Sequence, residues 1–299
     1  MNIFNRYYKV AGLTIQVKSD YPVSDNTFHP KFKKFRAEKP GIDNIKIHHH
    51  FHLPELPGNI KKFERFNDIQ WQIYKTRNKW IYKYRSCTPM DPDHCATAIF
   101  SLDHTYVDIY TADFDEKRYQ NYRSPALTFL NSDQILFSKL LCDRNGLILH
   151  SNGFDINGHG ILLAGKSGAG KSTLSAMLKK TGCKILCDDR MFIIRKEERF
   201  WLAGHWCHGS VPDVSNHTAP LKAIFFLAHA KKNKITRIQN KIFMTQKIIQ
   251  SMVKSFFNKQ DWAKTFSTIE ELVETTRFYE LQFDLSGEIC HKINKILEK

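Results

Sequence analysis

Apolar and polar side chains alternate along much of residues 1–110. Half-buried strands of antiparallel sheets show this period of two, because successive side chains point to opposite faces of the sheet. The pattern predicts strands at residues 8–18, 45–53, 69–76, 79–85, 97–102 and 105–110. Arg77-Asn78 and Asp103-His104 separate such runs and are interpreted as turns. We therefore expect residues 1–125 to form a mainly antiparallel β domain.

The rest of the chain, residues 126–299, mixes short apolar runs with helical spacing. Residues 111–130 lack a clear period and are interpreted as a connection. Strands are predicted at residues 147–150, 153–156, 161–164, 185–187, 221–227 and 278–283, and helices at 134–142, 173–180, 245–257 and 267–274. Ser132 and Asp133 are the predicted caps of the first of these helices. We expect an α/β domain here.

A complete phosphate-binding loop of the form G-x-x-x-x-G-K-[ST] lies within this second region. It reads Gly165-Lys166-Ser167-Gly168-Ala169-Gly170-Lys171-Ser172-Thr173. Glycines allow the backbone to approach a polyphosphate, and the amide groups of such a loop cradle phosphate oxygens at a helix N-terminus. Lys171 is expected to reach the terminal phosphates and Ser172 to bind Mg²⁺. The motif predicts that all nine residues contribute to nucleotide binding.

The surroundings of the loop fit the motif. A short apolar run at residues 161–164 precedes it, as expected of a buried strand. Leu174, Met177 and Leu178 follow at positions that share one helical face, and Thr181-Gly182 is expected to end that helix. The sequence thus predicts the strand–loop–helix arrangement that this motif requires, and an accidental glycine-rich turn is the alternative interpretation.

Two adjacent carboxylates, Asp188 and Asp189, follow the apolar run at residues 185–187. An acid at the end of a strand that comes after a phosphate-binding loop is typical of a Mg²⁺ ligand or a general base. Neighbouring side chains on a strand point to opposite faces, so we expect the two acids to have different roles. Solvated acids in a turn are the alternative interpretation.

Histidines at two places in the chain are candidate functional residues. His150 precedes the hairpin that leads into the loop strand, so it is expected near the same site, although a lone histidine is more often structural. His48, His50 and His52 would share one face of a strand. Three imidazoles at that spacing could bind Zn²⁺ or Ni²⁺, but such a row is more often a solvated strand face.

Composition narrows the functional classes. A net charge of +15 suits a nucleic-acid partner or an acidic substrate, but the basic residues are spread along the chain. No stretch approaches the roughly 18 apolar residues of a membrane span, and no apolar segment of a secretory signal follows Met1. The seven cysteines are irregularly spaced, which favours reduced thiols and a cytoplasmic protein. The sequence leaves the oligomeric state undetermined.

Residues 149–190 resemble the catalytic core of the HPr kinase/phosphorylase family, which shares the nucleotide-binding fold of phosphoenolpyruvate carboxykinase. The shared order is Leu149-His150-Ser151, then the hairpin at residues 153–158, the phosphate-binding loop, and Cys187-Asp188-Asp189-Arg190. The resemblance implies a P-loop serine kinase that uses ATP and Mg²⁺. It implies Asp188 as the general base, His150 beside Asp188, Lys171 on the phosphates, and Ser172 with Asp189 at the metal.

The chain departs from the family pattern after the acid pair. A Glu-Ile-Arg-Gly stretch that supplies a metal-binding carboxylate is replaced by residues 206–213, in which Cys207-His208 is a weak metal signal. The N-terminal region also differs from the regulatory domain of that family. The pattern is closer to HPr-kinase-like proteins, a group that includes free-serine kinases and kinases of peptide precursors.

We therefore expect a kinase that phosphorylates a hydroxyl, with serine of a protein, peptide or small molecule as acceptor. Residues 126–299 are expected to carry out the ATP chemistry, and residues 1–125 to recognise the acceptor or support assembly. Two alternatives remain open at this point. One is a P-loop ATPase or nucleotide-binding regulator without a phosphoacceptor, and the other is a nucleic-acid-binding protein.

Overall fold

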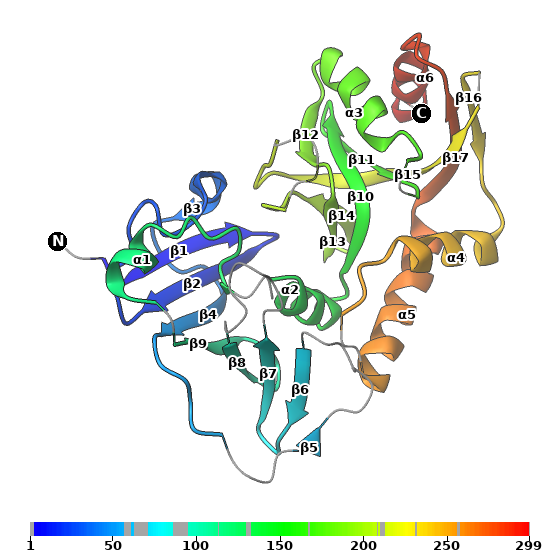
Figure 1. The fold of residues 1–299 in the computed structure, drawn as a ribbon. Helices are drawn as coiled ribbons and strands as arrows, with labels where there is room; N and C mark the ends of the chain where they lie inside the picture. The colour runs from blue at the N-terminus through cyan, green and yellow to red at the C-terminus, as the bar shows by residue number, and fades with distance from the viewer. Residues whose placement is uncertain are drawn as a thin grey trace. The chain divides into compact units, whose positions relative to one another are not determined.

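The structure is a computed structural model (Figure 1). It describes residues 3–56, 61–62, 71–85, 95–112, 114–129, 133–166, 168–207, 209, 213–230, 232–255 and 258–298. The chain divides into two compact units, Met1–Leu140 and Leu141–Lys299. The predicted cap Ser132 and the start of the strand predicted at residue 69 lie outside the described residues. The architecture is mixed α/β.

A nine-stranded mixed sheet forms the N-terminal unit, in the order β3-β1-β2-β4-β9-β8-β7-β6-β5. The strands are β1 (Asn5–Val10), β2 (Leu13–Ser19), β3 (Arg36–Ala37), β4 (Asp43–His50), β5 (Lys61–Lys62), β6 (Trp71–Lys75), β7 (Lys79–Arg85), β8 (Cys95–Ser101) and β9 (Tyr106–Thr111). Most neighbours are antiparallel, but β4 pairs in parallel with both β2 and β9. This parallel trio aligns the carboxyl ends of its three strands.

The single strand predicted at residues 8–18 is two strands in the structure. Ala11 and Gly12 have φ values of 52° and 83°, and they join β1 to β2 as a two-residue hairpin. Positive φ at both central residues is what a type I′ hairpin turn requires. The predicted connection at residues 111–130 contains the short helix α1 (Glu116–Gln120), and the 3₁₀ helix η1 (Pro30–Phe35) lies earlier in the chain.

Two sheets that share their longest strands form the C-terminal unit. The strands are β10 (Leu147–Ile156), β11 (His159–Ala164), β12 (Lys184–Cys187), β13 (Arg190–Lys196), β14 (Arg199–Ala203), β15 (Thr218–His229), β16 (Lys234–Arg237) and β17 (Arg277–Phe283). One sheet runs β12-β10-β11-β15-β17-β16, and the other runs β10-β13-β14-β15. The strands β10 and β15 therefore pass from one sheet into the other.

The strand β10 replaces the two strands predicted at residues 147–150 and 153–156. Its first half pairs with β13, and its second half pairs with β11 and β12. Gly153 stands where the strand changes sheets, and a β-carbon there would collide with the Met191 side chain. Because Ser151 on β10 pairs with Ala164, the last residue of β11, His150 lies at the end of the sheet where the phosphate-binding loop begins.

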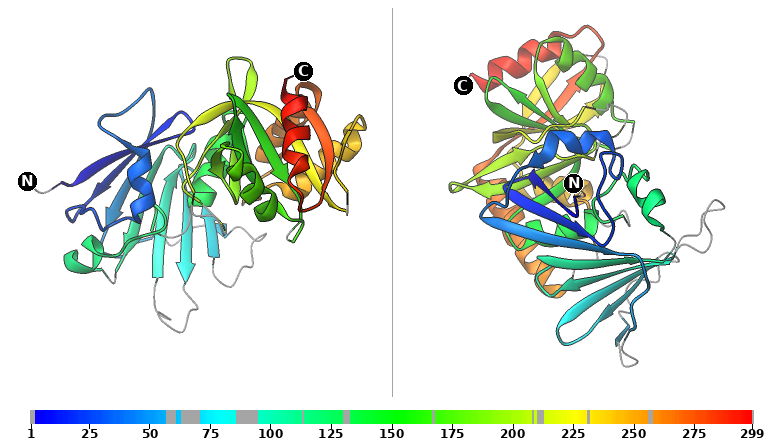
Figure 2. Two further views of the ribbon diagram at one scale, coloured as in Figure 1. Left: turned by 90° about the horizontal axis from the view of Figure 1, so that it is seen from above. Right: turned by 90° about the vertical axis from the view of Figure 1, so that its left-hand side faces the viewer.

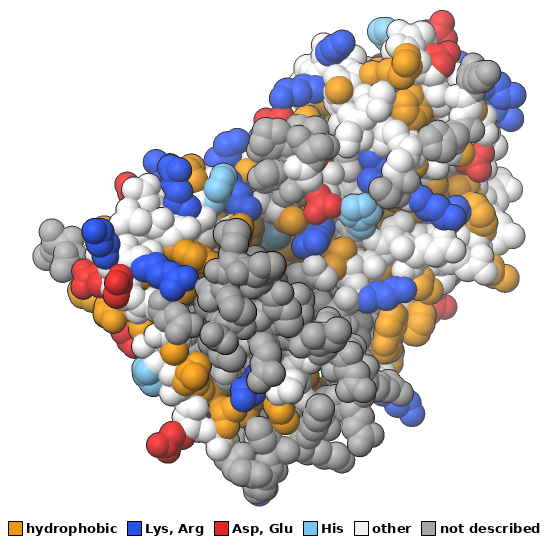
Figure 3. All heavy atoms as spheres, viewed as in Figure 1, with side chains coloured by type: hydrophobic (Ala, Val, Ile, Leu, Met, Phe, Trp, Pro, Cys, Tyr) orange, Lys and Arg blue, Asp and Glu red, His pale blue; other side chains and the backbone are white. Residues whose placement is uncertain are grey.

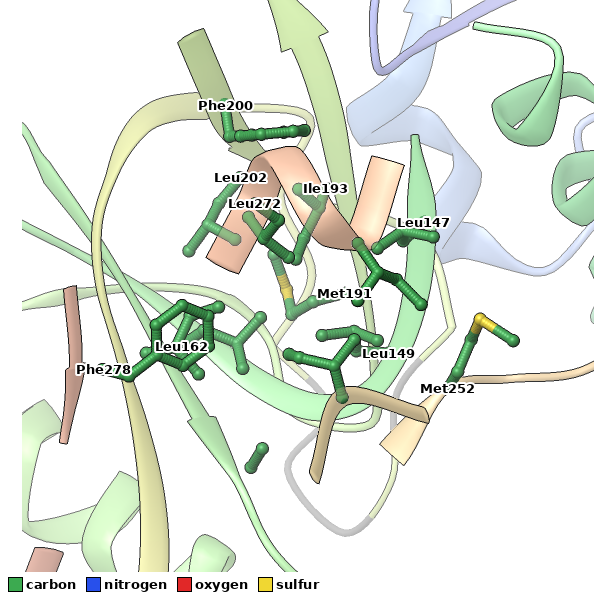
Figure 4. Close-up of a cluster of buried hydrophobic side chains, with 14 of the residues drawn as sticks. Leu147, Leu149, Leu162, Met191, Ile193, Phe200, Leu202, Met252, Leu272 and Phe278 are labelled. Carbon is green, nitrogen blue, oxygen red and sulfur yellow. The ribbon is translucent and has the colours of Figure 1, made fainter. Parts of the chain in front are cut away.

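Helices cover the C-terminal unit on two sides of its core. They are α3 (Lys171–Lys180), α4 (Lys241–Ser251), α5 (Lys259–Thr275) and α6 (Glu288–Leu297), and α2 (Asp133–Cys142) spans the boundary between the units. One apolar cluster buries residues of α4 and α5 with Leu149, Leu162 and Met191 (Figure 4). A second cluster buries residues of α3 and α6, which lie side by side in Figures 1 and 2.

The helix boundaries differ from the predicted ones because of capping. The helix α4 begins at Lys241, where the Asn240 side chain accepts a hydrogen bond from the backbone N–H of Phe243, and it ends at Ser251 instead of residue 257. The helix α5 begins eight residues before its predicted start at residue 267, because Asn258 and Asp261 form a capping box. These side chain–backbone bonds set the helix starts.

Two further findings concern the described helices and cysteines. No helix of the described residues is long and apolar enough to cross a membrane. The five cysteines whose side chains are described, Cys142, Cys183, Cys187, Cys207 and Cys290, are free thiols. The cytoplasmic location expected from the sequence stays a prediction.

Candidate functional site

The phosphate-binding loop connects β11 to α3, as its motif requires. The strand β11 lies between β10 and β15, and its last three residues are fully buried. The backbone N–H of Ala169 donates to the Lys166 carbonyl at 3.1 Å, and that of Leu174 donates to the Gly170 carbonyl at 2.9 Å, which starts the helix. The loop therefore begins at the end of a buried central strand and ends at the N-terminus of α3.

Three glycines of the loop are required for different reasons. Gly168 and Gly170 have φ values of 79° and 87°, a region that side chains disfavour. A β-carbon at Gly170 would lie 2.8 Å from the Phe283 ring, and one at Gly165 would lie 3.0 Å from the Ala169 β-carbon. No described atom lies within 4 Å of the same position at Gly168, so the loop faces open space there. Ser167 lies outside the described residues.

The Lys171 ammonium is hydrogen-bonded to the backbone at the start of the loop. Its Nζ donates to the Gly165 carbonyl at 2.8 Å and to the Lys166 carbonyl at 3.3 Å. Burial lowers the pKa of Lys171, and the nearby Asp189 carboxylate opposes that shift. Ser172 and Thr173 are exposed in the first turn of α3. The loop thus offers a cation, backbone amides and hydroxyls in one turn.

His150 lies beside Asp189. Its Nδ1 is 3.0 Å from the Asp189 Oδ1, and the Nε of Arg190 is 3.5 Å from the other carboxylate oxygen. The strand register explains the contact, because His150 pairs with Arg190 across β10 and β13, and the Ser151 N–H donates to the Asp189 carbonyl at 3.0 Å. The sequence-based expectation placed His150 beside Asp188, and the structure instead joins it to Asp189.

Asp188 points elsewhere, as expected of neighbouring carboxylates. Its side chain is 5% exposed, and its Oδ1 accepts a hydrogen bond from the Gly209 N–H at 2.7 Å. The Cys207 thiol lies 3.4 Å from Oδ2 of Asp189. The segment that replaces the Glu-Ile-Arg-Gly stretch therefore contacts both acids. His208 and residues 210–212 of that segment lie outside the described residues.

The Cys187 side chain is hydrogen-bonded to the segment at residues 206–213. Its Sγ donates to the Cys207 carbonyl at 2.6 Å, and burial raises the pKa of the thiol to about 12. Cys187 therefore stays a neutral hydrogen-bond donor near neutral pH and acts as a structural residue.

A cleft of about 660 Å³ opens beside the loop. It is lined by His150, Gly165, Lys166, Ala169, Phe226, Leu227, Lys247, Gln250 and Ser251. The last three belong to α4 and were not singled out from the sequence. Their i, i+3, i+4 spacing, which places them on one helical face, is the signal that could have grouped them. The N–H of Val253 donates to the Ile148 carbonyl at 2.9 Å and holds the end of α4 against β10.

Asn152 is a second residue that the sequence did not reveal. It is fully buried on β10, and its Nδ2 donates to the Ser175 hydroxyl at 2.6 Å. That hydroxyl donates in turn to the Lys171 carbonyl at 2.8 Å. Among the described residues, the Asn152 Oδ1 has no hydrogen-bond partner. Asn152 therefore ties the start of α3 to the strand that carries His150.

These residues suit a magnesium-bound polyphosphate. Left-handed glycines and open space at Gly168 leave room for phosphate oxygens along the loop. The Lys171 ammonium supplies the opposite charge. The Ser172 hydroxyl and the carboxylates of Asp188 and Asp189 are the kind of oxygen group that Mg²⁺ prefers as ligands.

Comparison with known proteins supports the resemblance inferred from the sequence. The chain is 30% identical over 114 residues to an HPr kinase/phosphorylase of Limosilactobacillus reuteri (strain DSM 20016), which covers 36% of this chain and 34% of the relative. It is 29% identical over 121 residues to an HPr kinase/phosphorylase of Chlorobium phaeobacteroides (strain BS1). This match covers 38% of this chain and 36% of the relative. The chain spans about a third of the length of these curated relatives.

Among solved structures, the HPr(Ser) kinase/phosphatase from Coxiella burnetii is similar at 13% identity and a TM-score of 0.30, covering 50% of this chain and 88% of the other. The curated relatives confirm a divergent HPr-kinase-like protein. The sequence model of a family distinct from these relatives matches residues 125–298, more than half of the chain. The chain belongs to that family, which is described as SynChlorMet cassette protein ScmC.

Proposed function

We propose that the C-terminal unit transfers the terminal phosphoryl group of ATP to a hydroxyl, with serine of a protein, peptide or small molecule as acceptor. The observation that carries this proposal is the convergence of two groups on one cleft. His150, which is bound to Asp189, and the phosphate-binding loop both line it. A phosphate cradle beside a histidine–carboxylate pair is the equipment that transfer to a hydroxyl needs.

Each residue has a proposed role. Residues 165–173 bind the phosphates through backbone amides, and Lys171 places its ammonium against the terminal phosphates. Ser172 and Asp189 hold Mg²⁺, which when bound neutralises charge on the phosphate oxygens. Asp188 accepts the proton of the acceptor hydroxyl as the oxygen–phosphorus bond forms and the bond to ADP breaks.

The division of labour between the two acids is the finer part of the proposal. Asp188 accepts a hydrogen bond from the Gly209 N–H, which fixes the position of its carboxylate. The contact between His150 and Asp189 makes the reversed assignment the alternative. In that arrangement Asp189 would accept the proton and Asp188 would hold the metal.

The N-terminal residues 1–125 are proposed to recognise the acceptor or to support assembly. The family match begins at residue 125, and every phosphate-binding residue lies after His150. A fragment that begins at Ser124 should keep Mg·ATP binding by calorimetry and lose transfer to the acceptor. A fragment that is folded by circular dichroism yet fails to bind nucleotide would contradict this division.

Radiolabelled phosphate transfer tests the function directly. The purified chain is incubated with [γ-³²P]ATP, Mg²⁺ and a panel of serine-containing peptides, proteins and free serine. The proposal expects label on an acceptor hydroxyl, and Asp188→Asn should abolish it while nucleotide binding remains. Release of phosphate to water at a rate that no acceptor changes would favour the ATPase alternative.

The nucleic-acid alternative has less support. Among the described residues of each unit on the face that Figure 3 shows, Lys and Arg side chains are scattered among other residues. Phosphate-backbone binding needs such charges gathered on one face. Binding to generic DNA or RNA that weakens steeply with salt would revive this alternative.

A further inference from the structure

The strands β2, β4 and β9 form a parallel trio in the N-terminal unit (Figure 1). Their register places the side chains of Asp20, His48, His50 and Asp108 close together. His48 and His50 lie two residues apart on β4 and so share a face of the sheet. Asp20 directly follows β2, whose Lys18 pairs with His48, and Asp108 on β9 pairs directly with His48. Strand register thus brings together residues separated by up to 88 positions in the sequence.

The ring nitrogens of both histidines converge on one carboxylate. The His48 Nε2 is 3.0 Å from Oδ1 of Asp20, and the His50 Nδ1 is 2.9 Å from its Oδ2. One donor atom from each of these three residues lies within 4.8 Å of the other two, and they are the only such triad found among the described residues. Donor atoms of a tetrahedral Zn²⁺ site with bonds of about 2.0–2.1 Å lie roughly 3.3 Å apart. Small movements would therefore suffice to admit the ion.

A second carboxylate orients His50. The His50 Nε2 is 3.2 Å from Oδ1 of Asp108, and the Tyr106 hydroxyl donates to the same oxygen at 2.6 Å. A histidine that binds a metal through one nitrogen almost always donates its other N–H to a carboxylate, carbonyl or water. Asp108 is placed to fix the tautomer of His50 that leaves the Nδ1 lone pair free for a metal.

We propose that Asp20, His48 and His50 form a Zn²⁺ site, with Asp108 as the positioning residue of His50 and a fourth position open to water. Imidazole nitrogens favour Zn²⁺ over Mg²⁺ or Ca²⁺, which prefer oxygen ligands. The charges of the Asp20 and Asp108 carboxylates together balance a divalent cation. The site is independent of the proposed phosphate chemistry.

The competing interpretation is an ordinary ion pair in which His50 bridges two aspartates. That interpretation gives no role to the second imidazole, although the rings of His48 and His50 are only 4.0 Å apart between centroids. The side chains of His50 and Asp108 are 16% and 13% exposed, which is less than exposed ion pairs usually show. A metal bound between the two rings uses one nitrogen lone pair from each of them.

Metal titration of the full chain separates the two interpretations. Protein freed of metal by chelation is titrated with Zn²⁺ by calorimetry, and Co²⁺ is added separately as a spectroscopic probe. The proposal expects one site, with the visible absorption bands of tetrahedral Co²⁺. Absence of Zn²⁺ binding, or a Co²⁺ spectrum typical of six oxygen ligands, would overturn it.

Three variants localise the site. His48→Ala combined with His50→Ala should weaken Zn²⁺ binding at least about 100-fold, because two of three ligands are lost. Asp108→Asn should weaken it about 10-fold and leave the number of bound ions unchanged, as loss of an orienting group does. His291→Gln, at an exposed histidine of α6, is the control and should have no effect.

One outcome with these variants would contradict the proposed Zn²⁺ site. Equal Zn²⁺ affinity in the wild type and in the folded double variant would assign the metal to other residues. Circular dichroism verifies folding, and Asp108→Asn, which preserves shape, decides the question if the double variant does not fold.

Discussion

The two units of this protein carry their polar functional residues in different kinds of structural position. In the N-terminal sheet, His48, His50 and Asp108 stand on a strand face, and their neighbours are set by strand register. In the C-terminal unit, the phosphate-binding loop and the acid pair follow the carboxyl ends of β11 and β12. Loops at strand ends can change shape around a ligand, while residues on a strand face are fixed by the pairing.

This difference separates what local sequence can specify from what tertiary pairing must supply. The loop contains nine consecutive residues, so its motif can be identified from the local sequence alone. The histidine cluster gains Asp20 and Asp108 only after three strands pair in parallel. We therefore expect substitutions in the two regions to have separate effects, and the following predictions test that separation.

The largest effect is expected at Lys171. Lys171→Ala should lower phosphoryl transfer at least about 100-fold, because the loop loses the cation that faces the terminal phosphates. Transfer of radiolabelled phosphate from ATP is the measurement. Lys180→Ala, at an exposed lysine of the same helix, is the matched control and should retain activity. Unchanged turnover in a folded Lys171→Ala protein would remove the basis for the kinase proposal.

The next effect concerns the acid pair. Asp188→Asn keeps the size of the side chain and removes its basicity, so Mg·ATP should bind nearly as before while transfer falls about 100-fold or more. Asp189→Asn should instead weaken the dependence on Mg²⁺. Calorimetry and transfer kinetics on both variants provide the comparison. The opposite pattern would assign the base to Asp189 and the metal to Asp188.

A smaller effect is expected from the loop glycines, and it appears in stability as well as binding. Gly170→Ala should destabilise the protein by about 2 kcal/mol, from a left-handed φ and a collision with Phe283. Gly168→Ala, where no described atom lies within 4 Å, should cost only about 1 kcal/mol. Thermal unfolding of both variants measures this difference. Equal losses would show that the Phe283 contact contributes nothing.

The smallest effect is expected when residues of the N-terminal unit are changed and nucleotide binding by the C-terminal unit is measured. The variant that combines His48→Ala with His50→Ala should bind Mg·ATP within about twofold of the wild-type affinity, because both residues lie outside the unit that carries the loop. Calorimetry with nucleotide is again the readout. A loss of more than tenfold in a folded variant would mean that the two chemistries are coupled.

The sequence predicted the loop and its setting because these depend on neighbours along the chain. Within residues 161–180, an apolar run is followed by a glycine-rich segment and then by apolar residues at helical spacing. In the structure these three segments are the end of β11, the phosphate-binding loop and α3. Asp188 and Asp189 follow a short strand for the same local reason. The role of each residue in catalysis stays a prediction.

Other features could not be predicted because they depend on long-range pairing. The contact of His150 with Asp189 follows from the register of β10 against β13. Lys247 enters the cleft because α4 packs against a distant strand. The helix α6 is not among the predicted helices, although its buried Ile289 and Ile293 show helical spacing. The hairpin at Ala11-Gly12 is hidden in the sequence because the apolar pattern continues through it.

The central claim is that the C-terminal unit transfers phosphate from ATP to a hydroxyl, and one measurement tests it most directly. Wild-type and Asp188→Asn proteins are incubated with [γ-³²P]ATP, Mg²⁺ and the acceptor panel, and labelled products are identified by mass spectrometry. The account predicts a phosphoserine product with the wild type and none with Asp188→Asn, although both proteins bind nucleotide. Nucleotide binding without any labelled acceptor, or equal labelling by both proteins, would contradict it.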